Sequence, residues 1–217
     1  MTPARQTGFT LSLRSDLHLL RKVWHIGTGL CVLFFHYFFE LPVKVAAGFL
    51  ICLGLFTLLI DFTRFRLEVF NQIVLKVMGP LMRESEKSSY SGMPFYALGV
   101  GLTLFLFPER IAILAILFLI FADPIASTIG IIYGREKLIE GKSLQGSLAC
   151  LVTCYFLSIG YGMYFGVPGS VLLGFSLLAA MVGCSSELLS RWMDDNLSIP
   201  LFSAMGISIL NFAFQIY

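Results

Sequence analysis

Seven apolar stretches recur along this 217-residue chain, and each approaches the about 20 residues that an α-helix needs to cross a bilayer. They are residues 24–39, 42–60, 94–107, 111–132, 147–165, 170–189 and 200–216. The chain is 57% hydrophobic and 13% charged, which is typical of a polytopic membrane protein and unlike a soluble domain. The sequence predicts an all-α fold of about seven transmembrane helices, with an N-terminal segment, 1–20, and a single membrane domain, 21–217.

The positive charges are unevenly distributed between the loops. If the N-terminus is cytoplasmic, thirteen of the fifteen Lys and Arg residues lie in cytoplasmic segments, and only Lys44 and Arg110 lie outside. Because Lys and Arg in short loops set the orientation, this bias predicts a cytoplasmic N-terminus and an external C-terminus. No internal repeat is visible, which argues against a transporter built from inverted halves.

Asp123 interrupts the fourth apolar stretch. A carboxylate at membrane depth is costly, and it usually carries protons, holds a metal or meets a substrate. Pro124 follows directly, which predicts a broken helix near Asp123. Ser127, Gly130 and Gly134 follow Asp123 at helical spacing, so that a polar face lined with small residues lets a ligand approach the backbone. The alternative is an Asp that relays protons or pairs with another helix.

The first cytoplasmic loop contains an amphipathic pattern near residues 64–79. Phe65, Val69, Ile73 and Val77 recur every four residues, and polar residues fall between them. Such a helix lies in the membrane interface, and the Gly-Pro pair at 79–80 would end it.

The second cytoplasmic loop, 133–146, has the composition of a phosphate-binding loop. Its glycines permit tight turns, and its side chains supply donors suited to phosphate. These residues are Gly134, Gly141, Gly146, Arg135, Lys142 and Ser143. The glycine spacing is wrong for a Walker loop. The alternative is an ordinary positive loop with turn glycines.

The third cytoplasmic loop is acidic. Glu187, Arg191, Asp194 and Asp195 fall at positions i, i+4, i+7 and i+8, so we expect three carboxylates on one helical face. Carboxylates that share phosphate oxygens suit Mg²⁺. The alternative is a solvated helix end with turn residues.

Basic residues open the first apolar stretch. Lys22 and His25 lie one helical turn apart and could contact a phosphate or a headgroup. The alternative is a positive anchor with an interfacial Trp.

These motifs, in this order, resemble the family of CTP-dependent lipid kinases, which includes dolichol, phytol and farnesol kinases and the CTP-dependent diacylglycerol kinase. The resemblance spans about residues 20–205. Its motifs are Arg21-Lys22-x-x-His25, Arg83-Glu84, Ser91-Gly92, Ala122-Asp123-Pro124-x-Ala126-Ser127, Tyr133-Gly134-Arg135, Gly141-Lys142-Ser143-x-x-Gly146-Ser147, Glu187 and Asp194-Asp195-Asn196-x-x-Ile199-Pro200.

The resemblance implies that the membrane domain transfers the γ-phosphoryl group of CTP to a lipid alcohol, either a polyprenol or phytol type or diacylglycerol. Asp123 and Asp195 would hold Mg²⁺, and Asp194 or Asp195 would serve as a second ligand or as the base. Glu187 and Arg191 would orient the acidic loop. The nucleotide and its phosphates would contact Arg135, Gly141, Lys142, Ser143, Gly146, Ser127, Lys22 and His25.

Two other functions stay open. A phosphatidate cytidylyltransferase would use the same metal and nucleotide, but its C-terminal signature is not seen here. A proton-coupled transporter would use Asp123 as its carrier and leave the second and third loops unexplained. The expected partners are CTP, a lipid alcohol and the bilayer, and not nucleic acid. We expect the active site on the cytoplasmic face of a bacterial inner membrane or of the endoplasmic reticulum.

Overall fold

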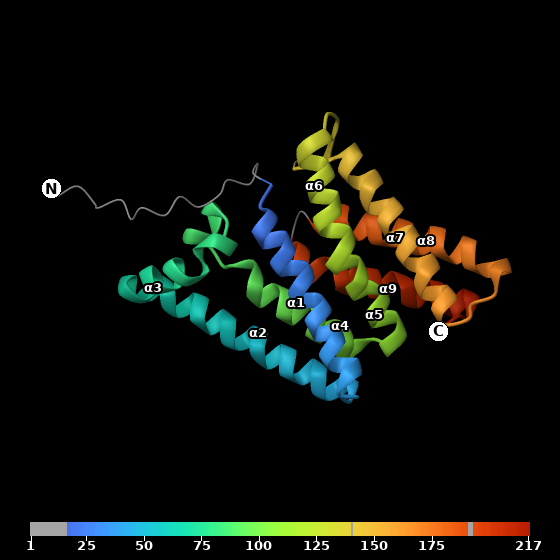
Figure 1. Ribbon diagram of the computed structural model, residues 1–217, viewed down its shortest axis with the longest axis horizontal. Coiled ribbons are helices and arrows are strands. Elements are labelled where there is room, and N and C mark those ends of the chain that lie inside the picture. Colours follow the sequence, from blue (N-terminus) through green and yellow to red (C-terminus); the bar gives the residue numbers. More distant parts are fainter. Residues whose placement is uncertain (1–16, 140, 191–192) are drawn as a thin grey trace.

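The computed structural model describes residues 17–139, 141–190 and 193–217. The chain forms helices joined by short turns (Figure 1). The α-helices are α1 Leu19–Phe38, α2 Val43–Arg66, α3 Glu68–Met78, α4 Gly92–Leu106, α5 Glu109–Leu117, α6 Asp123–Tyr133, α7 Leu144–Tyr164, α8 Gly169–Leu189 and α9 Asp195–Phe214. The remaining elements are 3₁₀ turns at Gly79–Leu81 and Glu84–Lys87, a π-helical turn at Phe118–Ala122, and strands β1 Lys137–Ile139 and β2 Lys142–Ser143.

All seven predicted apolar stretches form helix, which confirms a helical, polytopic membrane protein. Five helices are long and apolar enough to cross a membrane: α2, the continuous helix 109–133, α7, α8 and α9. The other two apolar stretches form α1, which carries the basic pair Arg21 and Lys22 in its first turn, and α4, which has only 15 residues.

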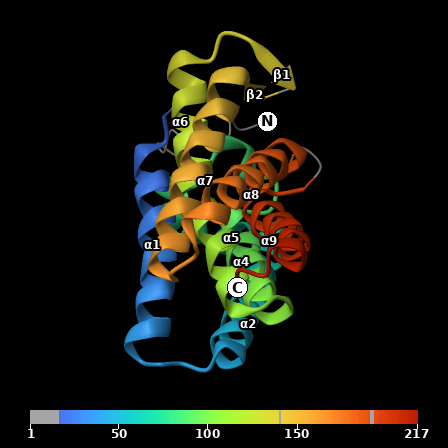
Figure 2. The ribbon, with the colours of Figure 1, turned by 90° about the vertical axis from the view of Figure 1, so that its right-hand side faces the viewer.

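The helix formed by α5, the π turn and α6 runs through the centre of the bundle. In the most apolar 18-residue segment of this helix 67% of the residues are buried, whereas in that of α2 only 22% are buried. Leu114 and Phe118 are fully buried in one apolar cluster, and Ile116 and Ile120 of the same helix are fully buried in a second. Figures 1 and 2 show α1 and α8 on opposite sides of it, and α9 packs against both α4 and α5.

The predicted interruption at Asp123 takes the form of a π turn and not of a break. Asp123 itself is helical, with φ −62° and ψ −52°. Because Pro124 has no N–H and its ring crowds the carbonyl four residues earlier, a regular α-helix cannot pass this point without adjustment. The widened turn at Phe118–Ala122 is this adjustment, and such turns are frequent at functional sites.

Small residues let α6 and α7 approach closely. A Cβ at Gly146 would lie 2.8 Å from the carbonyl oxygen of Ala126, and one at Gly130 would lie 3.1 Å from Ser143 Oγ. Substitution at either position would therefore push the second loop away from the central helix.

The first and second loops have more local structure than a simple connection. The predicted amphipathic helix is present as α3, which begins after the extended residue Leu67. The second loop, for which no strand was predicted, folds into an antiparallel hairpin of β1 and β2. Gly141 in its turn has φ +82°, a conformation that suits glycine.

The prediction for the third loop is wrong in its geometry. Helix α8 ends at Leu189, and α9 begins at Asp195 with Asp194 as its N-cap, so the predicted single face with three carboxylates does not exist. Asp194 prefers the cap because its side chain accepts the N–H of Asn196. The sequence also predicted that the last apolar stretch begins at Pro200, but the helix begins earlier, at Asp195, and Pro200 lies inside it. Arg191 lies outside the described residues.

Candidate active site

Two carboxylates from distant parts of the chain face the same cations. Asp123, from α6, and Asp195, from the first turn of α9, both act electrostatically on His25, Arg83 and Lys142. Because all three groups are shared, the two carboxylates belong to one electrostatic cluster. Of these residues, only Arg83 is absent from the site residues predicted from the sequence.

Lys142 ties the second loop to the third. Its Nζ lies 2.5 Å from Glu187 Oε1 and 3.7 Å from Asp195 Oδ1. Burial lowers the pKa of Lys142, but Asp195 and Glu187 raise it, and the net pKa lies above its ordinary value. Lys142 is therefore a fixed positive charge between two acids that the chain places on different helices.

The first turns of α1 reach the same region from the other side. Lys22 Nζ donates to Thr128 Oγ1 at 2.8 Å on α6. His25 Nε2 lies 3.0 Å from the carbonyl oxygen of Leu119 in the π turn. A carbonyl only accepts hydrogen bonds, so this nitrogen carries the proton. The π turn thus exposes an acceptor that α1 satisfies, and this contact holds α1 against the central helix.

Two buried polar atoms of residues that interact electrostatically with Asp123 and Asp195 lack partners within the described ranges. They are Arg83 Nε and Glu187 Oε2. Burial lowers the pKa of Arg83, yet a guanidinium stays charged in proteins. A buried charge with unused donors is costly unless a ligand satisfies it. These atoms fit an anionic ligand such as a polyphosphate together with its cation.

Mg²⁺ fits this donor set without being enclosed by protein. Across the residues that the structure describes, no group of three or more His, Cys, Asp or Glu side chains could hold a metal ion. Mg²⁺ usually binds one or two carboxylates together with substrate phosphates and water. Asp123 and Asp195 supply two such carboxylates, so the proposed magnesium site requires the nucleotide to complete it.

Asp194 has a structural role at the start of α9. Its Oδ1 accepts from Asn196 N at 3.0 Å and from Asn196 Nδ2 at 2.8 Å. Asn196 Nδ2 also donates to the carbonyl of Gly92, which joins α9 to α4. Burial raises the pKa of Asp194 to about 6, although the hydrogen bonds from Asn196 lower it.

This pKa predicts a pH dependence of stability. An unfolded Asp titrates near about 3.9, so between about pH 4 and 6 the folded protein binds more protons at Asp194 than the unfolded chain does. The free energy of unfolding should fall as the pH rises through this window, by at most about 3 kcal/mol. Thermal unfolding in EDTA should show a flatter profile for Asp194→Asn, which keeps a capping side chain; an unchanged profile would contradict this assignment.

Other predicted phosphate contacts are not aimed at the carboxylates. The side chain of Arg135 is exposed, and its backbone N–H donates to Gln145. Ser143 Oγ accepts the N–H of Gly146 as the N-cap of α7, and Ser127 Oγ donates to the carbonyl of Pro124. Gly141 forms the hairpin turn, and Gly146 packs against α6. Their role in binding phosphate stays a prediction.

A buried ion pair that the sequence analysis missed supports the segment that carries Arg83. Arg64 is 1% exposed, and its Nε donates to Asp61 Oδ1 at 2.7 Å. Its other nitrogens donate to the carbonyls of Glu86, Lys87 and Ser89. Asp61 Oδ2 accepts both the N–H and the hydroxyl of Ser91. Opposite charges three residues apart at the end of an apolar helix were the available signal.

Arg21 connects this supported segment to α1. Its Nη1 lies 2.5 Å from Oε1 of the buried Glu86. The N-terminal end of α1, the C-terminal end of α2 and the start of α4 are therefore joined by charged and polar contacts. At the opposite end of α1, His36 Nε2 lies 3.0 Å from Oε1 of Glu109, the first residue of α5.

Several known lipid kinases have sequences similar to that of this chain. The chain is 37% identical to CTP-dependent diacylglycerol kinase 1 of Schizosaccharomyces pombe over 66% of this chain and 71% of that protein. It is 30% identical to CTP-dependent diacylglycerol kinase 1 of Saccharomyces cerevisiae over 85% of this chain and 70% of that protein. It is 32% identical to phytol kinase of Synechocystis over 88% of this chain and 78% of that protein.

No family model matches the chain. No solved structure matches it either. The identities above extend over most of this chain and over more than two thirds of each relative. The chain belongs to the family of CTP-dependent lipid kinases.

Proposed function

We propose that this protein transfers the γ-phosphoryl group of CTP to the hydroxyl of a membrane lipid alcohol of the diacylglycerol or phytol type. The observation that carries the proposal is the pairing of Asp123 and Asp195 around the same cations, Arg83 and Lys142. Phosphoryl transfer depends on positioning and charge neutralisation, and this cluster supplies both signs of charge at the end of an apolar bundle.

The chemistry needs little covalent help from the protein. The hydroxyl oxygen of the lipid attacks the γ-phosphorus, the bond to the bridging oxygen breaks, and CDP leaves. The hydroxyl proton passes to a base, for which Asp195 and His25 are the candidates. Lys142 and Arg83 would neutralise the phosphate oxygens, and Lys22 would extend this positive surface. Mg²⁺ held by Asp123 and Asp195 would neutralise the polyphosphate further.

The site is proposed to face the cytoplasm in a protein of seven spans. The ends of α1, α2, α4, α7, α8 and α9 that surround it hold the loops with most of the Lys and Arg residues. A cytoplasmic N-terminus accounts for that distribution.

Labelled CTP tests the reaction directly. The purified protein is given Mg²⁺, a mixed lipid extract, and CTP labelled on either the α- or the γ-phosphate. Label from the γ position should appear in the lipid fraction, and mass analysis of the product identifies the alcohol. Label from the α position would mean a cytidylyltransferase, and transfer of neither label would overturn the proposal.

The two adjacent aspartates at the start of α9 should differ in effect. Asp195→Asn removes a charge that faces Arg83 and Lys142, and we expect kcat to fall by about 10²–10³. Asp194→Asn keeps the cap on α9 and should change kcat only severalfold. Steady-state rates of both variants at saturating CTP measure this difference. Equal losses would mean that Asp195 has no separate role.

Lys142→Ala should raise the KM for CTP by about 10- to 100-fold, because a charge-assisted hydrogen bond to phosphate contributes about 1.5–3 kcal/mol. The matched control is Lys137→Ala, an exposed lysine on the other strand of the hairpin. Initial rates at varied CTP check both variants. If the KM of Lys142→Ala is unchanged, Lys142 serves only to pair Glu187 and Asp195.

A further inference from the structure

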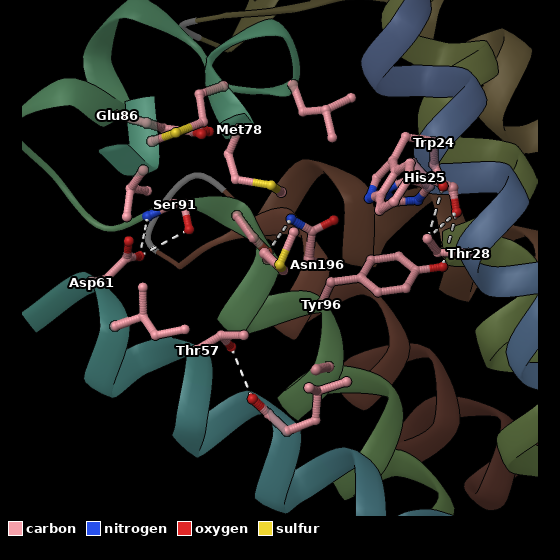
Figure 3. A pocket seen from close by; sticks show the side chains of 18 of the residues that line it. Trp24, His25, Thr28, Thr57, Asp61, Met78, Glu86, Ser91, Tyr96 and Asn196 are labelled. Carbon is pink, nitrogen blue, oxygen red and sulfur yellow. Dashed lines mark hydrogen bonds between the residues drawn. The ribbon is translucent and has the colours of Figure 1, made fainter. Parts of the chain in front are cut away.

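An apolar cavity of about 520 Å³ lies between α1, α2, α3 and α4, beside the candidate active site. Figure 3 shows Trp24 and His25 on one wall, Thr57 and Asp61 on the opposite wall, and Tyr96 between them. Its size falls within the range of about 300–1,000 Å³ that is usual for ligand pockets. Most of its lining is hydrocarbon, contributed by Leu50, Leu53, Phe70, Val74, Ala97 and Val100.

The polar groups of the cavity lead to the carboxylate cluster. His25 lines the cavity and also interacts electrostatically with Asp123 and Asp195. Arg21 and Asn196 line it as well, and Asn196 directly follows Asp195 in α9. The cavity and the proposed phosphate site therefore share a boundary at α1 and at the start of α9.

His25 offers an acceptor at that boundary. Its Nε2–H is used by the carbonyl of Leu119, so Nδ1 of the neutral ring carries a lone pair. No residue in the described part of the chain donates a hydrogen bond to Nδ1. A hydroxyl group at this end of the cavity could donate to it.

Helix α3 separates the cavity from the surroundings of the bundle. Phe70, Val74 and Met78 line the cavity and are half-buried, whereas Val69 is 74% exposed. An amphipathic helix with a second apolar face of this kind lies in the membrane interface. A hydrocarbon chain that passes α3 therefore moves from the bilayer into the cavity without crossing water.

We propose that this cavity holds a hydrocarbon chain of the acceptor lipid, with the lipid hydroxyl at the His25 end and facing Asp123. The proposal rests on the kinase function proposed above. The apolar lining selects a chain, and the polar boundary at His25 places the hydroxyl beside the phosphate site. The oxygen then reaches the γ-phosphorus of a nucleotide held by Lys142 and Arg83, and its proton goes to Nδ1 of His25.

Photolabelling without nucleotide tests the cavity independently of catalysis. The full-length protein in lipid nanodiscs is exposed to a diacylglycerol that carries a diazirine in one chain, and labelled peptides are mapped by mass spectrometry. We expect label on cavity-lining residues of α3 and α4, and we expect excess unlabelled diacylglycerol to compete. Label only on outward-facing residues, or label that does not compete, would overturn the proposal.

Two tryptophan variants of α2 provide a matched pair. Leu53 lines the cavity and is 40% exposed, whereas Leu55 is 54% exposed and does not line it. Leu53→Trp should reduce cavity labelling and raise the KM for long-chain diacylglycerol by about tenfold or more, with the KM for CTP unchanged. Leu55→Trp should leave both quantities near wild type. Equal effects of the two variants would contradict the cavity assignment.

The two proposals fail differently. If the wild-type protein phosphorylates no lipid alcohol but cavity labelling is competed, the lipid site stands and the kinase reaction is wrong. If γ-label reaches the lipid while Leu53→Trp behaves like Leu55→Trp, the kinase stands and the acceptor binds elsewhere.

Discussion

Asp123→Asn should abolish phosphoryl transfer, with kcat reduced by about a thousandfold or more, because the variant removes the central charge of the site. Asp123 interacts electrostatically with Lys22, His25, Arg83 and Lys142, and asparagine has nearly the same shape. The loss should appear in single-turnover measurements with CTP and diacylglycerol at saturating Mg²⁺.

The fold should survive this substitution. Asp123 is partly exposed, and no hydrogen bond of its side chain is among those described, so thermal unfolding should change little. Glu68→Gln, which neutralises an exposed carboxylate at the start of α3, is the matched control and should keep normal activity. Near-normal turnover of Asp123→Asn would remove Asp123 from the proposed metal site.

Arg64→Ala should destabilise the protein by about 3–5 kcal/mol, because it leaves Asp61 buried without its partner. The same change removes the hydrogen bonds from Arg64 to the carbonyls of Glu86, Lys87 and Ser89. These hydrogen bonds fix the segment that carries Arg83. Denaturant or thermal unfolding in detergent measures the loss. Activity should fall as well, since Arg83 would no longer be fixed.

Arg66→Ala is the matched control, because Arg66 lies two residues further along α2, is exposed and stacks over Phe62. It should cost little, as surface substitutions do. The double variant Asp61→Asn with Arg64→Met should be more stable than Arg64→Ala, because no unpaired charge remains. If Arg64→Ala and Arg66→Ala unfold alike, the buried network does not support the fold.

Hydropathy and residue chemistry predicted the membrane class and the helices, and they selected the candidate site residues. Asp123 was identifiable because a charge is expensive inside apolar sequence and few functions retain one. Lys142 and Asp195 were identifiable from the polar composition of the second and third loops. The interruption at Pro124 was predictable for the same local reason, since proline cannot donate a helix hydrogen bond. Each of these inferences depends on one residue and its neighbours in the chain.

The remaining features depend on contacts between distant segments. Sequence spacing alone suggested that Glu187 and Asp195 share a helix, whereas they lie on α8 and α9 and Lys142 joins them. The π turn was not predictable because its free carbonyl is satisfied by His25, 94 positions away. The role of Arg64 was missed for a similar reason, since its partners at Glu86 and Ser89 become neighbours only after folding.

Helix α1 forms one wall of the cavity and also supplies Lys22 and His25 to the carboxylate cluster. It is fastened to the central helix by polar contacts, from Lys22 to Thr128 and from His25 to the carbonyl of Leu119. An outward displacement of α1 would therefore widen the cavity and withdraw the charge of Lys22 from Asp123 in a single motion. The lipid compartment and the charge balance around Asp123 cannot be adjusted separately while this helix moves as a rigid body.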